Sequence, residues 1–301
     1  MGGATMQAVK RYRSKIESEV AAKLICNSEF MRAIGLTKGN RKLTPILRKE
    51  IWKKFIDVVE PIQKKLVKDL SNTFAKQEIA ALKKLGSLYR AIGDTGIETK
   101  AKDDKFFSDA ELKKWVEEFA EISEPHIEDG MTAGATATLA RLGSDIVFDP
   151  TIDPVQEFIK DKAFANSLMV NETTDKVLRK ALADGLAEGQ GVDQVKKRIK
   201  EIFEYSKESR ARMIAQTEMI GAVNKGGIEG SKQSGVVWGN QWVGSLDSSI
   251  REEHEAMTAN EEAVPLGETF SNGCEYPGDQ GGDAASTINC RCTLLELTEK
   301  P

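Results

Sequence analysis

The first half of the chain has apolar residues at every third or fourth position, the spacing that places them on one face of a helix. One stripe lies near the N-terminus, and a second follows a break at residues 35–40. The stripes consist of Val9, Tyr12, Ile16, Val20 and Leu24, and of Ile51, Phe55, Val59, Ile62, Leu66, Leu70 and Phe74. Pro61 is expected to kink the second helix, because proline removes a backbone donor and crowds the preceding turn. The pattern therefore predicts two long helices before residue 93.

A third helix is predicted from Ser108 to about Leu142. Ser108 and Glu111 have the spacing of a capping box, in which each side chain binds a backbone N–H of the first turn. Residues 131–140 of this helix are rich in Ala, Gly and Thr, so another helix can approach closely. Two Asp-Pro pairs at residues 149–154 then indicate a boundary, because the residue before a proline avoids the helical conformation.

Shorter elements are predicted beyond this boundary. Helices are expected at residues 177–186, 195–203, 206–231 and 247–257, and strands at 236–238, 241–243 and 292–297. Glycine-rich turns separate the last of these elements. The predicted fold class is mainly α: an elongated helical N-terminal region, a helical domain and a small, Gly-rich α+β C-terminal module.

Three regions follow from this pattern. Residues 1–148 are predicted to be a basic-to-mixed long-helix region suited to docking or assembly. Residues 149–235 are expected to form the helical part of a second domain, and residues 236–301 its small α+β module. The sequence has no run of about 18 apolar residues, so we expect no membrane span.

Charge is distributed unevenly along the chain. The formal net charge is −4, but residues 1–100 carry 21 Lys and Arg against 10 Asp and Glu, a net +11 that leaves −15 for the rest. A basic segment of this kind favours an acidic partner such as DNA, or the chain's own acidic part. A solvated lysine-rich helix face is the alternative interpretation, and for a helical segment alone it is the preferred one.

The C-terminal residues hold the candidates for metal binding. Cys26 stands alone, whereas His254, Cys274, Cys290 and Cys292 are the ligand types of a tetrahedral zinc site. Their spacing argues against one, because Cys290 and Cys292 form Cys-x-Cys and nothing pairs closely with His254 or Cys274. The alternative is that the thiols are small buried hydrophobes and the histidine is held by a hydrogen bond. We therefore expect no cofactor, with a structural zinc as the alternative.

The catalytic motifs that the residues around His254 suggest are incomplete. Thr258 occupies the position at which a zinc protease motif beginning at His254 requires its second histidine. Asp247, Arg251 and His254 would share one face of a helix, as an ion-pair row or an acid–base cluster, and the row is favoured. The chain is therefore not expected to be an enzyme. A metal-dependent enzyme using Asp247, Glu253 and His254 stays open as an alternative.

An ordered series of motifs between about Asp153 and Leu297 resembles a known family. A helical block at residues 171–203 is followed by a second helix and then by a polar motif and a cysteine motif. These motifs contain Arg210, Thr217, Glu218 and Asn224; Trp242, Asp247, Arg251 and His254; and Asn289, Cys290, Arg291 and Cys292. The order is similar to that of the phage head-morphogenesis proteins, minor capsid proteins similar to protein F of phage Mu.

The resemblance implies a structural role in a phage head. Such a protein would act in procapsid assembly, associate with the portal, scaffold or major capsid proteins, and accompany DNA at ejection. It would be located in the virion, inside the capsid or at the portal vertex, after assembly in the cytoplasm of the bacterial host. Residues 1–100 would then be the region that contacts DNA, and no small-molecule substrate is implied. A DNA-binding accessory protein is the alternative role.

Overall fold

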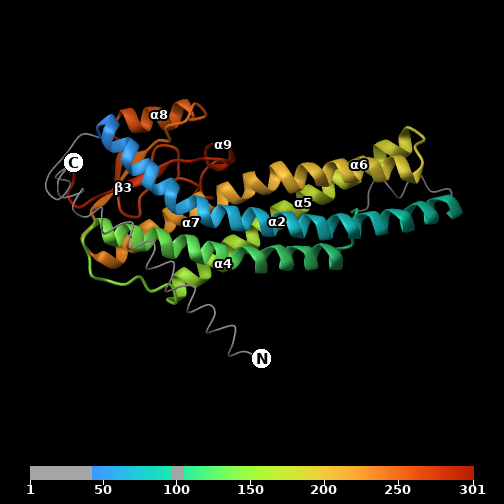
Figure 1. Cartoon of the computed structure of the whole chain (residues 1–301), viewed down its shortest axis with the longest axis horizontal. Coiled ribbons are helices and arrows are strands. Elements are labelled where there is room, and N and C mark those ends of the chain that lie inside the picture. The colour runs from blue at the N-terminus through green and yellow to red at the C-terminus, as the bar shows by residue number, and fades with distance from the viewer. Residues whose placement is uncertain (1–42, 96–104) are drawn as a thin grey trace. The chain divides into compact units, whose positions relative to one another are not determined.

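The computed structural model describes residues 43–95 and 105–301, and it is mainly helical (Figure 1). The helices are α2 (Pro45–Thr95), α4 (Asp109–Arg141), α5 (Asp153–Ala187), α6 (Val192–Tyr205), a π-helical turn η1 (Ser206–Arg210), α7 (Ala211–Ser234), α8 (Glu252–Ala259) and α9 (Ala284–Thr287). The strands are β1 (Gly239–Val243), β2 (Ala263–Pro265) and β3 (Thr293–Leu297). The predicted class, mainly α with a small α+β C-terminal part, is confirmed. The predicted helix at residues 9–24 and Cys26 lie outside the described residues.

The chain divides into two compact units that interleave along the sequence. The first, here called the sheet unit, contains the described residues 43–63, 126–156 and 216–301. The second, the helical unit, contains the described residues 64–95, 105–125 and 157–215. The predicted regions with boundaries at residues 148 and 235 stay a prediction.

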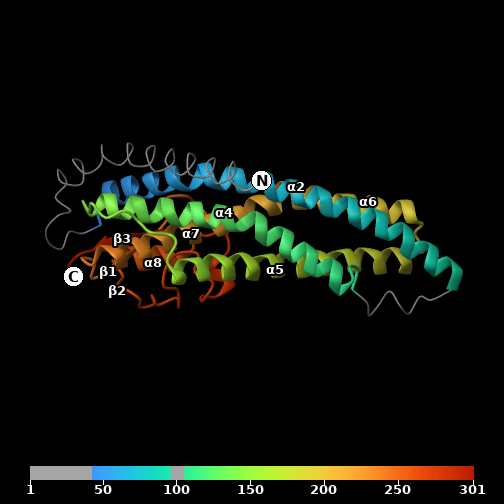
Figure 2. The same cartoon turned by 90° about the horizontal axis from the view of Figure 1, so that it is seen from below.

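The sheet unit is built around a three-stranded antiparallel sheet in the order β2-β1-β3 (Figure 2). Gly239 on the central strand faces Pro265 of β2 and Leu297 of β3. One apolar cluster of this unit comprises Ile228, Trp242, Met257, Phe270, Cys274, Tyr276, Cys290, Cys292 and Leu294. A smaller one joins Leu47 and Ile51 of α2 to Val243 and Leu295. Both clusters bury strand residues against helices, so each helps to fix the sheet.

Helices α4 and α7 cross at very short distance within the sheet unit. A Cβ atom added at Gly134 would lie 2.0 Å from the carbonyl oxygen of Val223, and one at Gly226 would lie 2.0 Å from that of Met131. Only glycine lets two backbones approach this closely. The close helix approach predicted from residues 131–140 is therefore confirmed.

The helical unit has an aromatic and polar core. Phe74 and Phe119 make an edge contact with ring centroids 5.1 Å apart, and the Gln77 amide donates to Asn171 Oδ1 at 2.8 Å. Arg210 lies over the Phe74 ring at 5.6 Å. The buried α5 positions include Lys162, Asn166, Ser167, Asn171, Thr174 and Asp175, so polar residues supply part of this core.

Several predicted boundaries are confirmed. Ser108 and Glu111 form the predicted capping box, with the Ser108 N–H donating to Glu111 Oε2 at 2.8 Å. Every member of the predicted stripe from Ile51 to Phe74 is buried, and α2 continues through Pro61 as one helix.

None of the helices in residues 43–95 and 105–301 combines the length and the apolar character that crossing a membrane requires.

Other element predictions were wrong. The helix predicted at residues 177–186 belongs to α5, which begins at Asp153, because buried polar residues of α5 interrupt the apolar stripe. Residues 236–238 precede the strand instead of forming it, and α8 begins at Glu252 instead of residue 247. The short elements β2 and α9 were not predicted at all.

Candidate functional site

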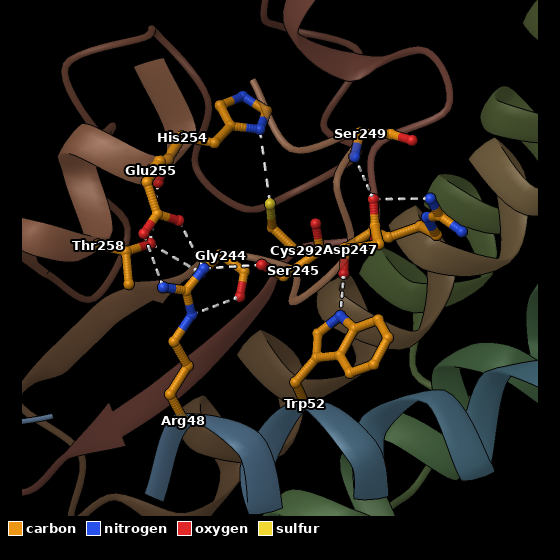
Figure 3. Close-up of polar contacts among 11 residues, drawn as sticks. Arg48, Trp52, Gly244, Ser245, Asp247, Ser249, His254, Glu255, Thr258 and Cys292 are labelled. Atoms are coloured by element: carbon orange, nitrogen blue, oxygen red, sulfur yellow. Dashed lines mark hydrogen bonds and ion pairs between the residues drawn. The ribbon is translucent and has the colours of Figure 1, made fainter. Parts of the chain in front are cut away.

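Three of the predicted metal ligands meet in the sheet unit. His254 lies on α8, and Cys290 and Cys292 lie directly before β3. The His254 Nδ1 atom is 3.7 Å from Cys290 Sγ and 3.5 Å from Cys292 Sγ, and all three ligand atoms lie within 4.8 Å of one another. Figure 3 shows His254 pointing from its helix toward the Cys292 sulfur. The side chains are 1%, 2% and 1% exposed, so the cluster is shielded from solvent.

The backbone around the cysteines has a specific local conformation. Asn289 has a φ of 61°, a left-handed value that asparagine tolerates better than most residues. The Cys290 N–H donates to Thr287 O at 3.2 Å, and the Cys292 N–H donates to Cys290 Sγ at 3.4 Å. This turn places both thiols on the same side of the chain, facing α8.

Helix α7 holds this segment through three polar side chains. The Thr217 hydroxyl accepts from the Asn289 N–H at 2.9 Å, and the Gln216 amide donates to Asn289 Oδ1 at 2.8 Å. The buried Asn224 amide donates to Cys292 O at 3.1 Å and to Pro277 O at 3.1 Å. Its Oδ1 accepts from Thr293 Oγ1 at 3.0 Å. These bonds fix the positions of residues 289–293. Together with Ile288, these residues are here called the cysteine segment (residues 288–293).

The polar motif before α8 contacts the cysteine segment from another side. Asp247 forms an ion pair with Arg291 at 2.8 Å, and Arg251 donates to Ile288 O at 2.5 Å. The predicted row of Asp247, Arg251 and His254 on one helix face was wrong, because Asp247 precedes α8 and Arg251 is its N-cap residue. Each of the three residues instead contacts the cysteine segment.

Trp242 completes the surroundings of His254. The centroid of its ring lies 4.9 Å from the centroid of the imidazole and 5.1 Å from the centroid of the Phe270 ring. Cys274 belongs to the same apolar cluster and is fully buried, but it is not part of the three-ligand group among the described residues. Burial raises the pKa of the Cys274 thiol to about 12, so it is neutral at physiological pH.

The paired thiols differ in their electrostatics. A hydrogen bond with Cys292 lowers the pKa of Cys290 despite burial, and His254 lowers it further. The pKa of Cys292 is raised by its hydrogen bond to Cys290, by burial and by the Cys290 charge. Together with one imidazole, the two sulfurs form a set of ligands suited to zinc. Their role as metal ligands stays a prediction.

Two residues of α2 also hold this region, and no pattern in the sequence indicated them. The Trp52 indole N–H donates to Arg291 O at 2.9 Å (Figure 3). Arg48 forms a bidentate ion pair with Glu255 of α8, at 2.9 and 2.6 Å, and donates to the carbonyl oxygens of Gly244 and Ser245. The Arg48 hydrogen bond lowers the pKa of Glu255, which keeps the pair charged.

The remaining motif residues lie elsewhere. Arg210 belongs to the helical unit, where it donates to Thr174 Oγ1 at 2.7 Å and to Val170 O at 2.8 Å. Glu218 is a buried residue of α7. Glu253, the acidic residue of the enzyme alternative, faces the Ser286 hydroxyl at 3.4 Å. Asp247 is paired with Arg291, so the two carboxylates of that alternative have other partners.

The comparisons with known proteins agree with the predicted resemblance. A family model described as "Phage Mu protein F like protein" matches residues 176–295. The resemblance to this family is therefore confirmed over these residues, which include the whole cysteine segment. Neither the search of curated proteins nor the search of solved structures gave a match. The match covers 120 of the 301 residues, which is less than half of the chain.

Proposed function

We propose that this protein is a minor head protein of a tailed phage, which acts in procapsid assembly at the portal and enters the virion. The observation that carries the proposal is the convergence of the family motifs on one segment. Thr217 and Asn224 of α7, and Asp247, Arg251 and His254 around α8, all contact residues 288–293.

The nature of these contacts supports a structural role. Asp247 is neutralised by Arg291, Arg251 is bonded to a backbone carbonyl, and the Asn224 amide bonds backbone carbonyls and a hydroxyl. Polar groups that bond one another and the backbone fix a conformation, whereas a catalytic site needs groups directed at a substrate. The motif residues therefore suit a rigid module that presents a surface to neighbouring head proteins.

Partners and location follow from the same role. The protein would contact the portal, scaffold or major capsid proteins, and it would lie inside the capsid or at the portal vertex. Contact with packaged DNA, and passage with it at ejection, is supported by the basic first 100 residues. Helix α2 carries several of these charges on exposed side chains, namely Lys49, Lys53, Lys68 and Lys83.

Co-sedimentation with procapsids tests this proposal. The full chain is produced together with the portal, scaffold and major capsid proteins of the phage that encodes it, and the particles are separated on a gradient. We expect the chain in the procapsid fraction, and much less of it when the portal protein is omitted. A chain that stays in the soluble fraction with all partners present contradicts the proposal, and equal recovery without portal contradicts portal association.

A DNA-binding accessory protein is the second candidate, and one observation favours it. The net charge of +11 on the first 100 residues is large for a chain whose total is −4. If this were the main function, the chain would bind DNA in the absence of other head proteins and would not need procapsids for its location.

A further inference from the structure

We propose that His254, Cys290 and Cys292 bind one Zn²⁺ ion, which ties the cysteine segment to α8. The site goes beyond the proposed head function, because it concerns how the C-terminal module is held together and not what the protein binds. It rests on the placement of three ligand side chains that come from two separate parts of the sequence.

The spacing of the ligand atoms fits a tetrahedral zinc centre. Bonds of about 2.3 Å to sulfur and about 2.1 Å to nitrogen, at the tetrahedral angle, put a nitrogen and a sulfur ligand about 3.6 Å apart. The observed distances from His254 Nδ1 are 3.7 Å to Cys290 Sγ and 3.5 Å to Cys292 Sγ. Both agree with the expected separation, so an ion can be bound with little movement of the side chains.

The surroundings of the three ligands also fit a metal. The Cys292 N–H donates to Cys290 Sγ, a bond that stabilises a thiolate ligand. Trp242 packs against the His254 ring and restricts its orientation. The cluster is buried within the apolar core, where uncoordinated thiols and an imidazole would form only weak hydrogen bonds with one another.

The position of the cluster gives the ion a structural purpose. The sheet has three short strands, and the chain between β2 and β3 is mostly turns with one four-residue helix. A small module of this kind gains stability when a metal closes a loop across it. An ion on His254, Cys290 and Cys292 links α8 directly to the residues that begin β3.

Metal content and a cobalt spectrum test the site in the full-length protein. The protein is purified with zinc in the growth medium and dialysed under reducing conditions, and we expect about one zinc per chain by mass spectrometry. After exchange with Co²⁺ we expect a thiolate-to-cobalt charge-transfer band and the visible bands of a tetrahedral ion. Absence of bound metal, or a cobalt spectrum without the charge-transfer band, overturns the proposal.

Variants then assign the ligands. Cys290→Ser, Cys292→Ser and His254→Asn should each lower the metal content severalfold, whereas Cys274→Ser should keep it. Cys274 is the matched control, because it is a fully buried cysteine of the same apolar cluster. Circular dichroism identifies variants that fail to fold. If a variant does not fold, the cobalt spectrum of the unchanged protein tests metal binding in its place. If a folded Cys290 or Cys292 variant keeps the charge-transfer band unchanged, or a folded Cys274→Ser variant loses it, the three-ligand assignment is wrong.

Discussion

Asn224 has the most demanding polar environment among the motif residues. It is 4% exposed, its amide donates to the carbonyl oxygens of Pro277 and Cys292, and its Oδ1 accepts from Thr293. Three parts of the C-terminal module therefore depend on one side chain of α7. A buried amide in this position stabilises the fold only while all of its partners are present.

Replacing Asn224 by leucine should lower the free energy of unfolding by about 3 kcal/mol, because two carbonyl oxygens and a hydroxyl lose their partner inside the core. Urea unfolding at neutral pH measures the change. Gln216→Ala is the control, since Gln216 bonds the same segment from a more exposed position and should cost about 1 kcal/mol or less. Equal losses for the two variants would contradict the role of Asn224.

The buried Glu296 carboxylate makes the free energy of unfolding depend on pH in the acid range. It accepts hydrogen bonds from Arg141, with Nε at 3.0 Å, and from Thr138 Oγ1 at 2.7 Å, and its side chain is 5% exposed. Burial alone would raise its pKa, but the Arg141 charge and these hydrogen bonds outweigh burial and lower the pKa below 4.5. The contribution of the Glu296 carboxylate to the stability of the fold is therefore complete above its unfolded-state pKa and is lost as pH falls through its folded-state pKa.

Glu296→Gln should cost about 3 kcal/mol at pH 7, because it leaves Arg141 partly buried without its counter-charge. The difference from the unchanged protein should shrink as the pH falls below about 4.5. Thermal or urea unfolding between pH 7 and pH 3 measures both effects. A difference that stays constant over this range would show that the Glu296 charge is not the cause.

The sequence indicated the metal-ligand candidates but not the residues that support them. His254, Cys290 and Cys292 were predicted because cysteine and histidine are rare and chemically distinctive. Trp52 and Arg48 were not predicted, because each lies within a helix of many apolar and basic residues, where nothing marks an indole or a guanidinium that bonds a distant carbonyl. Such partners depend on tertiary contacts that the pattern does not contain.

Helices α4 and α7 cross with their backbones in contact. Gly134 and Gly226 each allow the backbone of one helix to touch that of the other. Gly134→Ala should force the helices apart and lower the free energy of unfolding by about 3 kcal/mol. Gly86→Ala on α2 is the control, because an added Cβ there meets nothing within 4 Å and should stabilise the helix by about 0.5–1 kcal/mol.

Thermal unfolding of the two glycine variants distinguishes packing from helix propensity. We expect the melting temperature to fall for Gly134→Ala and to stay the same or rise slightly for Gly86→Ala. A rise for both variants would mean that α4 and α7 do not cross as closely as described.

Element boundaries were predictable where local signals were strong. The capping box at Ser108 placed the start of α4 within one residue, and the strand predicted at residues 292–297 placed β3 equally well. Helix α5 was underestimated because Ser167, Asn171 and Thr174 are polar yet buried, each bonding the carbonyl four residues earlier. The three-residue strand β2 depends on pairing with β1 and has no pattern of its own.

The uneven charge of the chain predicts salt-dependent DNA binding. Each phosphate contact contributes about 0.9 to the slope of log affinity against log salt concentration. Changing Lys49, Lys53, Lys68 and Lys83 of α2 to Gln in the full chain should therefore reduce this slope by about 3.6 when each lysine contacts one phosphate, measured by fluorescence anisotropy with duplex DNA.

The control for the DNA experiment carries the same change in charge. It replaces four other exposed lysines by Gln, namely Lys160, Lys176, Lys197 and Lys200 on α5 and α6. We expect these changes to leave the slope nearly unaltered. An equal reduction in both variants would attribute binding to total charge, and no salt dependence in the unchanged protein would exclude phosphate contact.

The head-protein role is tested most directly by quantitative mass spectrometry of purified particles. Procapsids and mature virions are isolated from cells infected with the phage that encodes this chain, and the chain is counted relative to the major capsid protein. We expect the chain in both particles at low copy number. Its absence from both particles, while it is abundant in the infected cells, would contradict a role as a head protein.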